Sequence, residues 1–180
     1  MAADFTPQKL PLKTFNSKYL EFLGRHHSKE EVFNKVKLLK EYGITNINVD
    51  LIYALPNQTL LELENDIDII LSLDIPHIST YSLIIEPNTV LYNKRIKNID
   101  EDLDNDMYNI IISKLNNYIH YETSNFAKNG YESKHNLTYW NNDYYYGFGL
   151  GASGYVSDIR YDNTRNLNKY LNHFYIDLIH

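Results

Sequence analysis

The sequence predicts an α/β fold built from parallel βα units, and three observations lead to that prediction. Segments of helical periodicity alternate with two short apolar runs between residues 28 and 118. Two capping boxes mark where helices begin, and glycine or proline follows where they end. Because strands that alternate with helices of this length usually pair in parallel, helices are expected to cover both faces of the sheet.

The first predicted helix begins after Ser28 and follows an irregular lead-in. Ser28 and Glu31 form a capping box, in which the two side chains satisfy backbone N–H groups of the first turn. Apolar residues then recur at helical spacing, and Gly43 suits the left-handed turn that ends a helix. Residues 1–12 contain two prolines and no periodicity, so they are expected to form a loose segment.

Residues 46–53 are predicted to form a strand whose two faces differ in polarity. One face carries Ile47, Val49, Leu51 and Tyr53, and the other carries Asn46, Asn48, Asp50 and Ile52. Asp50 lies near the carboxyl end of the strand, where ligands of parallel α/β folds bind. Two interpretations stay open: Asp50 holds an amine or hydroxyl group of a ligand, or it accepts hydrogen bonds from a neighbouring helix N-terminus.

The following elements continue the alternation. Thr59 and Glu62 form a second capping box, which opens a second helix. A second strand is predicted over residues 77–85 and a third helix over about residues 100–118. Residues 166–179 carry one more apolar stripe at helical spacing, which predicts a last helix.

Composition narrows the classes of function. The chain has 180 residues, a hydrophobic content of 43%, a formal net charge of -6 and no cysteine. Disulfides, thiolate zinc sites and cysteine-ligated iron–sulfur clusters are therefore excluded for these residues. The acidic balance argues against a nucleic-acid partner. No apolar run reaches the length of a membrane span and no signal peptide is visible, so a cytoplasmic protein is expected, of unknown oligomeric state.

Two motifs carry only weak functional signals. Arg25 stands beside two histidines before the first helix; its guanidinium suits a carboxylate ligand, but a solvated basic turn is the simpler interpretation. Residues 149–154 match G-x-G-x-x-G literally. The dinucleotide fingerprint requires a helix after the glycines, and residues 155–157 do not open a convincing one, so we reject that interpretation.

The stretch from Glu132 to Tyr155 is the most unusual in the chain. It combines the only tryptophan, a run of aromatic residues and a His-Asn pair, with His135 at its centre. A neutral imidazole among aromatic rings is a possible axial haem ligand. From the residues alone, a satisfied core histidine in an aromatic cluster is the preferred alternative.

Five blocks of the sequence carry a resemblance to a known family. They read LGRHH at 23–27, NVDLIYALPNQT at 48–59, PHISTYSLIIEP at 76–87, YETSNFAK at 121–128 and ESKHNLTYWNN at 132–142. In this order they resemble the HemW-type haem chaperone branch of the coproporphyrinogen III dehydrogenase-like (HemN-like) radical-SAM family. The resemblance runs from about residue 12 to the end of the chain.

The resemblance implies two sets of binding residues. Asp50 and Arg25 would contact the amino-acid part of S-adenosylmethionine, and Tyr81 and Leu83 would lie near its adenosine. His135, Asn136, Tyr139 and Trp140 would form the haem-binding motif, with His135 as the ligand of the haem iron. The family also implies a 4Fe-4S cluster, haem or a porphyrin as the bound molecule, and respiratory haemoproteins as partners that receive haem.

The resemblance further implies a partial fold. Residues 1–120 would be the C-terminal part of a radical-SAM barrel, a partial TIM-like barrel from about its fourth strand onward. Residues 121–180 would begin a HemW-type C-terminal region. The family's CxxxCxxC motif is absent, Lys13 stands where a glutamine is usual, and Ser153 replaces the usual histidine of a Gly-Ala-His segment.

These features lead to an expected function with two alternatives. We expect a truncated HemW-like protein that keeps haem binding and has lost radical-SAM chemistry. The alternatives are a fragment of a coproporphyrinogen III dehydrogenase-like enzyme and a gene remnant without a present role.

Overall fold

The computed structural model describes residues 7–172 and 176–179, and it divides the chain into two compact units. The first unit comprises Met1–Glu132 and the second Ser133–His180. This division lies after the boundary expected at residue 120, because a strand hairpin that follows residue 118 joins the first sheet. The assignment of the two segments to family domains stays a prediction.

The first unit is built on a five-stranded sheet with the order β1-β2-β3-β5-β4. The strands are β1 (Gln8–Lys13), β2 (Ile47–Tyr53), β3 (His77–Ser82), β4 (Ile119–Glu122) and β5 (Asn125–Ala127). The first three strands run parallel, whereas β5 pairs antiparallel with both β3 and β4. The prediction of parallel βα units is therefore confirmed for β2 and β3, and β1 adds a parallel strand that was not predicted.

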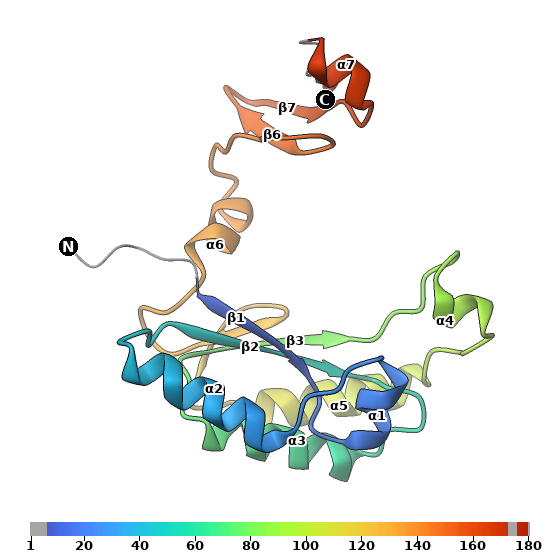
Figure 1. Ribbon diagram of the computed structural model, residues 1–180, viewed down its shortest axis with the longest axis vertical. Helices are drawn as coiled ribbons and strands as arrows, with labels where there is room; N and C mark the ends of the chain where they lie inside the picture. Colours follow the sequence, from blue (N-terminus) through green and yellow to red (C-terminus); the bar gives the residue numbers. More distant parts are fainter. Residues whose placement is uncertain (1–6, 173–175, 180) are drawn as a thin grey trace. The chain divides into compact units, whose positions relative to one another are not determined.

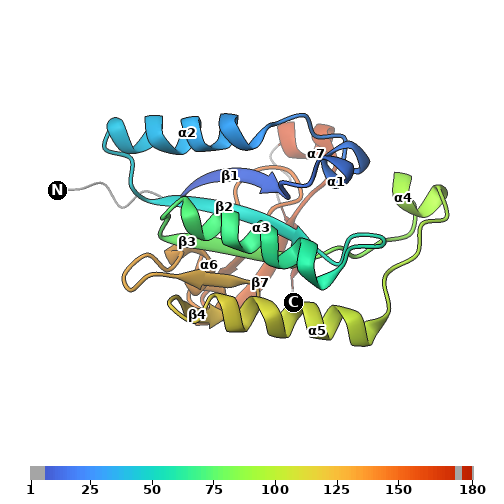
Figure 2. The same ribbon diagram turned by 90° about the horizontal axis from the view of Figure 1, so that it is seen from below.

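Three long helices lie on the same face of this sheet, as Figures 1 and 2 show, so the prediction that helices cover both faces is wrong for the long helices of this unit. They are α2 (Lys29–Glu41), α3 (Leu60–Ser72) and α5 (Glu101–Lys114), and two short helices, α1 (Ser17–Phe22) and α4 (Val90–Asn93), belong to the connections. Both predicted capping boxes are present, with the side chains of Ser28 and Thr59 each accepting from the backbone N–H of the glutamate three residues on. Gly43 has a φ of +77°, as expected for the residue that ends a helix.

The core lies between the sheet and the helices, and the alternation predicted for β2 decides which residues enter it. Ile47, Val49 and Leu51 are completely buried in the apolar cluster, together with Ile78 of β3 and Phe126 of β5. The helices contribute further fully buried side chains to this cluster: Leu63, Ile67, Ile70, Met107 and Ile111. The other side chains of β2 consequently face away from the helices.

Strand β1 corrects the prediction of a loose segment over residues 1–12. Gln8, Lys9 and Leu10 pair with residues 47–49 of β2, and the register shifts before Lys13. Local periodicity did not reveal this strand, because its partner lies far along the chain and Pro11 interrupts the pattern at the shift. Residues 1–6 lie outside the described residues.

The second unit contains a three-stranded antiparallel sheet of the order β6-β7-β8, with α6 before it. Its elements are α6 (Lys134–Trp140), β6 (Ser153–Val156), β7 (Ile159–Asn163), α7 (Leu167–Leu171) and β8 (Ile176–Ile179). The prediction of one helix over residues 166–179 is wrong. Helix α7 ends at Leu171, and residues 176–179 form a strand because their backbone pairs with β7. Residues 173–175 lie outside the described residues.

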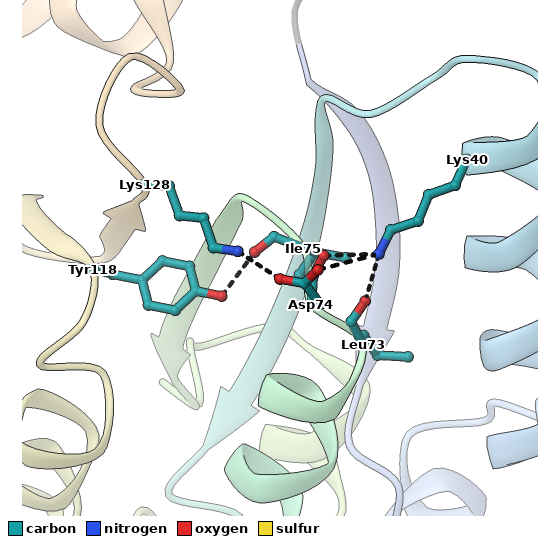
Figure 3. A network of polar contacts seen from close by, with 6 residues as sticks. All are labelled: Lys40, Leu73, Asp74, Ile75, Tyr118 and Lys128. Atoms are coloured by element: carbon teal, nitrogen blue, oxygen red, sulfur yellow. Dashed lines mark hydrogen bonds and ion pairs between the residues drawn. The ribbon is translucent and has the colours of Figure 1, made fainter.

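A polar network fastens the turn between α3 and β3, at the amino end of that strand (Figure 3). Asp74 occupies this turn with a φ of +48°. Its carboxylate accepts a hydrogen bond of 2.6 Å from Lys128 Nζ, and its backbone carbonyl accepts one of 2.8 Å from Lys40 Nζ. The Tyr118 hydroxyl donates to the backbone carbonyl of Ile75 at 2.7 Å. The ends of α2, α5 and β5 are thereby tied to one turn.

Replacement of Tyr118 by phenylalanine tests the buried bond of this network. The side chain of Tyr118 is buried, so the Tyr118→Phe variant leaves the carbonyl of Ile75 without this donor while the ring is kept. We expect the free energy of unfolding to fall by about 1 kcal/mol. Urea denaturation measures the change. Tyr42→Phe serves as control, because that residue is 78% exposed and its replacement should change stability by less than about 0.5 kcal/mol.

Candidate functional site

A row of polar side chains crosses the face of the first sheet that is turned away from the long helices. The parallel register places Asn48 beside His77 and Asp50 beside Ser79, and the antiparallel register places Asn125 beside Ser79. All five residues are less than 9% exposed. Since side chains alternate across a sheet, these registers bring the five residues together on one face.

The side-chain amide of Asn48 is the centre of this row. Its oxygen lies 2.7 Å from His77 Nδ1 and accepts a hydrogen bond of 3.1 Å from the Ser79 hydroxyl. Its Nδ2 donates to the Asp50 carboxylate at 2.8 Å. One amide therefore orients an imidazole, a hydroxyl and a carboxylate. Its oxygen accepts from the imidazole and the hydroxyl, and its nitrogen donates to the carboxylate.

The hydrogen bonds of His77 fix which of its nitrogens carries the proton. The Asn48 oxygen can only accept, so Nδ1 is the protonated nitrogen and Nε2 accepts from the Tyr121 hydroxyl at 2.8 Å. Burial lowers the pKa of His77 to about 4, because an imidazolium ion would lose its hydration. His77 is consequently neutral at physiological pH and acts as a fixed hydrogen-bond partner.

Asp50 faces a cation that strand β1 supplies. Lys13 Nζ lies 3.5 Å from Asp50 Oδ2, and the two side chains are 18% and 12% exposed. Lys13 has a φ of +81° and lies at the register shift of β1. A backbone irregularity of this kind redirects a side chain at the end of a strand. Chemically, Asp50 is a mostly buried carboxylate that holds an ammonium group.

The other residues expected to contact S-adenosylmethionine lie in different surroundings. Tyr81 is 37% exposed and follows Ser79 on the same face of β3. Leu83 lies just beyond β3 and borders a cavity of about 240 Å³. Arg25 is exposed beyond α1, and within residues 7–172 no hydrogen bond or ion pair joins it to Asp50. The structure thus brings Asp50 and Tyr81 to one face, and it pairs Asp50 with Lys13 rather than Arg25.

Most of the polar row was not predicted from the sequence. Asn48 was placed on the correct face of β2, but His77, Ser79 and Asn125 were not recognised as its partners. The signal was present in β3, where His77 and Ser79 alternate with apolar Ile78 just as Asn48 and Asp50 alternate in β2. Pairing the two strands by their polar alternation would have found the row.

Helix α6 displays the residues expected to bind haem. Ser133 caps the helix, and its hydroxyl accepts from the backbone N–H of Asn136. His135 is exposed, so its interpretation as a satisfied core histidine is wrong. Tyr139 and Trp140 are 45% and 63% exposed. The helix therefore presents an imidazole and two aromatic rings to the solvent instead of packing them into a core.

The residues of α6 also contact one another. His135 Nε2 lies 3.3 Å from the Tyr139 hydroxyl, as expected for residues four positions apart on one helix face. The Tyr139 ring packs edge-to-face against Tyr145, with 4.6 Å between the ring centroids. Asn136 and Trp140 are likewise four positions apart and share the adjoining face of the helix.

The glycines of the same stretch allow close packing of the main chain. A Cβ atom on Gly147 would collide with the backbone carbonyl of Ser153, and one on Gly154 would collide with the Tyr161 ring. Strand β6, not a helix, follows Gly151. The helix that a dinucleotide fingerprint requires is therefore absent at this point, in agreement with the rejected reading of the motif.

Two kinds of feature are absent from the described residues. No group of three or more His, Asp or Glu side chains in residues 7–172 and 176–179 is arranged to hold a metal ion. In the same residues no helix combines the length and the apolar character needed to cross a membrane.

The pH dependence of stability tests the buried imidazole. His77 binds a proton in the unfolded chain below about pH 6.5 but in the folded chain only below about pH 4. Stability should therefore fall as the pH drops from 6.5 to 4, by about 3 kcal/mol in total. Urea midpoints across this range measure the loss. A His77→Gln variant should lack this part of the slope, and an unchanged slope in that variant would disprove the assignment.

Several known proteins resemble this chain in sequence. Residues 9–70 match the family described as the radical SAM superfamily. The chain is 46% identical over 168 residues to the "Heme chaperone HemW" of Lactococcus lactis, which covers 90% of this chain and 44% of the relative. It is 47% identical over 174 residues to the protein of that name from Bacillus subtilis, covering 93% and 45%. The chain thus spans less than half the length of these relatives.

A solved structure with the same fold is available for comparison. It is described as "Coproporphyrinogen III oxidase (HemN) from Escherichia coli is a Radical SAM enzyme" and superposes with a TM-score of 0.76. The match covers 94% of this chain and 43% of the other, at 19% identity, and at that identity it supports the fold alone. The sequence relatives favour the chaperone branch over the oxidase alternative. Over most of its length the chain is therefore similar to proteins named heme chaperone HemW, and its residues 9–70 carry the radical SAM match.

Proposed function

We propose that this chain binds haem on the exposed face of α6 and hands it on as a haem chaperone does. The observation that carries the proposal is the exposed His135, which shares α6 with the exposed rings of Tyr139 and Trp140. Relatives at 46% and 47% identity carry the name "Heme chaperone HemW". Since the chain spans less than half of those relatives, the proposal concerns the part of such a protein that is present here.

The residues of α6 suit a molecule that is bound and later released. An imidazole is a common axial ligand of haem iron, and His135 is the candidate for that role. Aromatic rings offer flat apolar faces to a flat macrocycle, and Trp140 and Tyr139 present such faces. Asn136 adds an amide on the same helix that can hydrogen-bond a propionate group. An exposed site leaves the bound haem accessible to a recipient. We propose respiratory haemoproteins as the recipients and the cytoplasm as the location of this chain.

The first sheet is the proposed place for S-adenosylmethionine. Asp50 already holds an ammonium group, that of Lys13, so the carboxylate has the chemistry to hold an amine. Tyr81 and Leu83 would border the adenosine and Arg25 the carboxylate; these roles rest on the family resemblance. The 4Fe-4S cluster of the family does not fit this chain, because its 180 residues contain no cysteine to supply thiolates.

A haem titration of the purified chain tests the proposed function. We expect ferrous haem to give a shifted Soret band with saturable binding. The His135→Ala variant should bind ferrous haem at least about ten-fold more weakly, because it lacks the imidazole nitrogen. His26→Ala is the matched control, since it removes an exposed histidine of the first unit and should leave the affinity unchanged.

The two variants separate the possible outcomes of this titration. Equal loss of affinity in both variants would indicate nonspecific association of haem with surface histidines. An affinity that is unchanged in His135→Ala would remove α6 from the proposed site. Absence of saturable binding by the unaltered chain would overturn the proposed function as a whole.

A further inference from the structure

The only asparagine–glycine pair in the sequence, Asn129–Gly130, forms an exposed turn shortly after β5. The turn is closed by a hydrogen bond of 2.9 Å from the backbone N–H of Tyr131 to the carbonyl of Lys128, and Gly130 has a φ of +83°. Within residues 7–172 and 176–179, Asn129 makes no hydrogen bond. The side-chain amide of Asn129 is therefore free to move against its own main chain.

An asparagine that precedes glycine can react with the peptide bond that follows it. The peptide nitrogen of the next residue attacks the side-chain carbonyl carbon, and the new C–N bond closes a succinimide ring. The C–N bond to the side-chain amide breaks, and ammonia leaves with the proton that the peptide nitrogen has lost. Water then opens the ring at one of its two carbonyl carbons and leaves aspartate or isoaspartate. The reaction consumes one water molecule, and no oxidant or reductant takes part.

The surroundings of Gly130 favour this reaction. The attack requires the peptide between Asn129 and Gly130 to rotate toward the side chain, and glycine restricts such a rotation less than any other residue. A Cβ atom placed on Gly130 would meet no atom within 4 Å, so neighbouring groups leave room for the movement. The hydrogen bond from Tyr131 closes an exposed turn, where water competes for it. The turn can therefore open without disturbing the core.

Asn16 is in the opposite situation and provides an internal comparison. It precedes Ser17, and no other asparagine besides Asn129 precedes a glycine, alanine or serine in this sequence. The side-chain oxygen of Asn16 accepts from the backbone N–H of Lys18 at 3.1 Å, and its Nδ2 donates to Glu62 at 3.1 Å. These two bonds hold the amide in the capping position of α1, so its carbonyl carbon is not free to meet the following peptide nitrogen.

We propose that Asn129 is a site of spontaneous deamidation in the segment that leads from the first unit to the second. This inference is independent of the proposed haem binding. Lys128 is fixed by its Nζ to Asp74 (Figure 3) and by its backbone N–H to Pro76, and the first unit ends at Glu132. Conversion adds one negative charge to this segment, and isoaspartate also adds one carbon atom to the main chain. Because ammonia is lost, the modified form accumulates as the protein ages.

The experiment follows deamidation of the purified full chain over time. Peptide mapping by mass spectrometry measures aspartate and isoaspartate at each asparagine. We expect conversion at Asn129 to be at least about ten-fold faster than at Asn16, because only Asn129 has a free amide and a glycine after it. The rate at Asn129 should rise about ten-fold for each pH unit, because the attacking peptide nitrogen must lose its proton.

Two glycine variants separate the reaction from general effects of a changed turn. Gly130→Ala should slow conversion at Asn129 at least about ten-fold, because the added side chain hinders both the rotation and the attack. Gly24→Ala is the matched control. Gly24 is also exposed, has a φ of +64° and would meet no atom within 4 Å with an added Cβ, but it follows a leucine. Its replacement should leave the rate at Asn129 unchanged.

The same measurements include the results that would overturn the inference. Conversion at Asn129 that is no faster than at Asn16, or that Gly130→Ala does not slow, would remove the site. Conversion that is more than about ten-fold slower in the folded chain than in urea would show that the turn protects the amide, and it would equally overturn the inference. If Gly130→Ala does not fold, the comparisons with Asn16 and with urea in the unaltered chain still decide.

Discussion

The register between β2 and β3 is the constraint on which the rest of the first unit depends. It places the apolar residues Ile47, Val49 and Leu51 against the helices and Asn48 and Asp50 on the opposite face. A slip by one residue would exchange the two faces. Each aliphatic side chain removed from the core would cost about 1.5–3 kcal/mol, and a carboxylate would enter an apolar layer. The side-chain amide of Asn48 can bridge His77, Ser79 and Asp50 only in the register that the core imposes.

The position of Lys13 also depends on hydrogen bonds made by the two residues that follow β1. Asp66 of α3 accepts a hydrogen bond of 2.6 Å from the Thr14 hydroxyl and one of 2.9 Å from the backbone N–H of Phe15. Burial raises the pKa of Asp66, while these two bonds oppose the shift. The two residues after Lys13 are thereby fixed to a buried side chain of α3. This anchor explains how Lys13 is held in a left-handed conformation that places its ammonium group beside Asp50.

The elements that could be predicted from the sequence are those whose local signals agree with the tertiary structure. The capping boxes at Ser28 and Thr59 were predictable because every atom involved lies within four residues. Strand β1 was not predictable, because its partner β2 lies far along the chain. The end of α7 was not predictable either, because the pairing of β8 with β7 interrupts the apolar stripe. The two candidate sites differ in the same way in how far they could be predicted. The pairing of His135 with Tyr139 follows from helix periodicity, whereas the contact of Lys13 with Asp50 requires the irregularity in β1.

The hydrogen-bonding state of each polar group distinguishes an ordering role from a binding role. In the row around Asn48 the polar groups are buried and satisfy one another, so the network stabilises one arrangement of the strands. On α6 the situation is reversed. Tyr139 and Trp140 leave large aromatic faces in water, and within residues 7–172 and 176–179 the His135 side chain hydrogen-bonds only to another exposed side chain. Water competes directly for that bond, so an incoming ligand breaks it at low cost. The weakly paired groups of α6 therefore suit the proposed uptake and release of haem better than the buried row does.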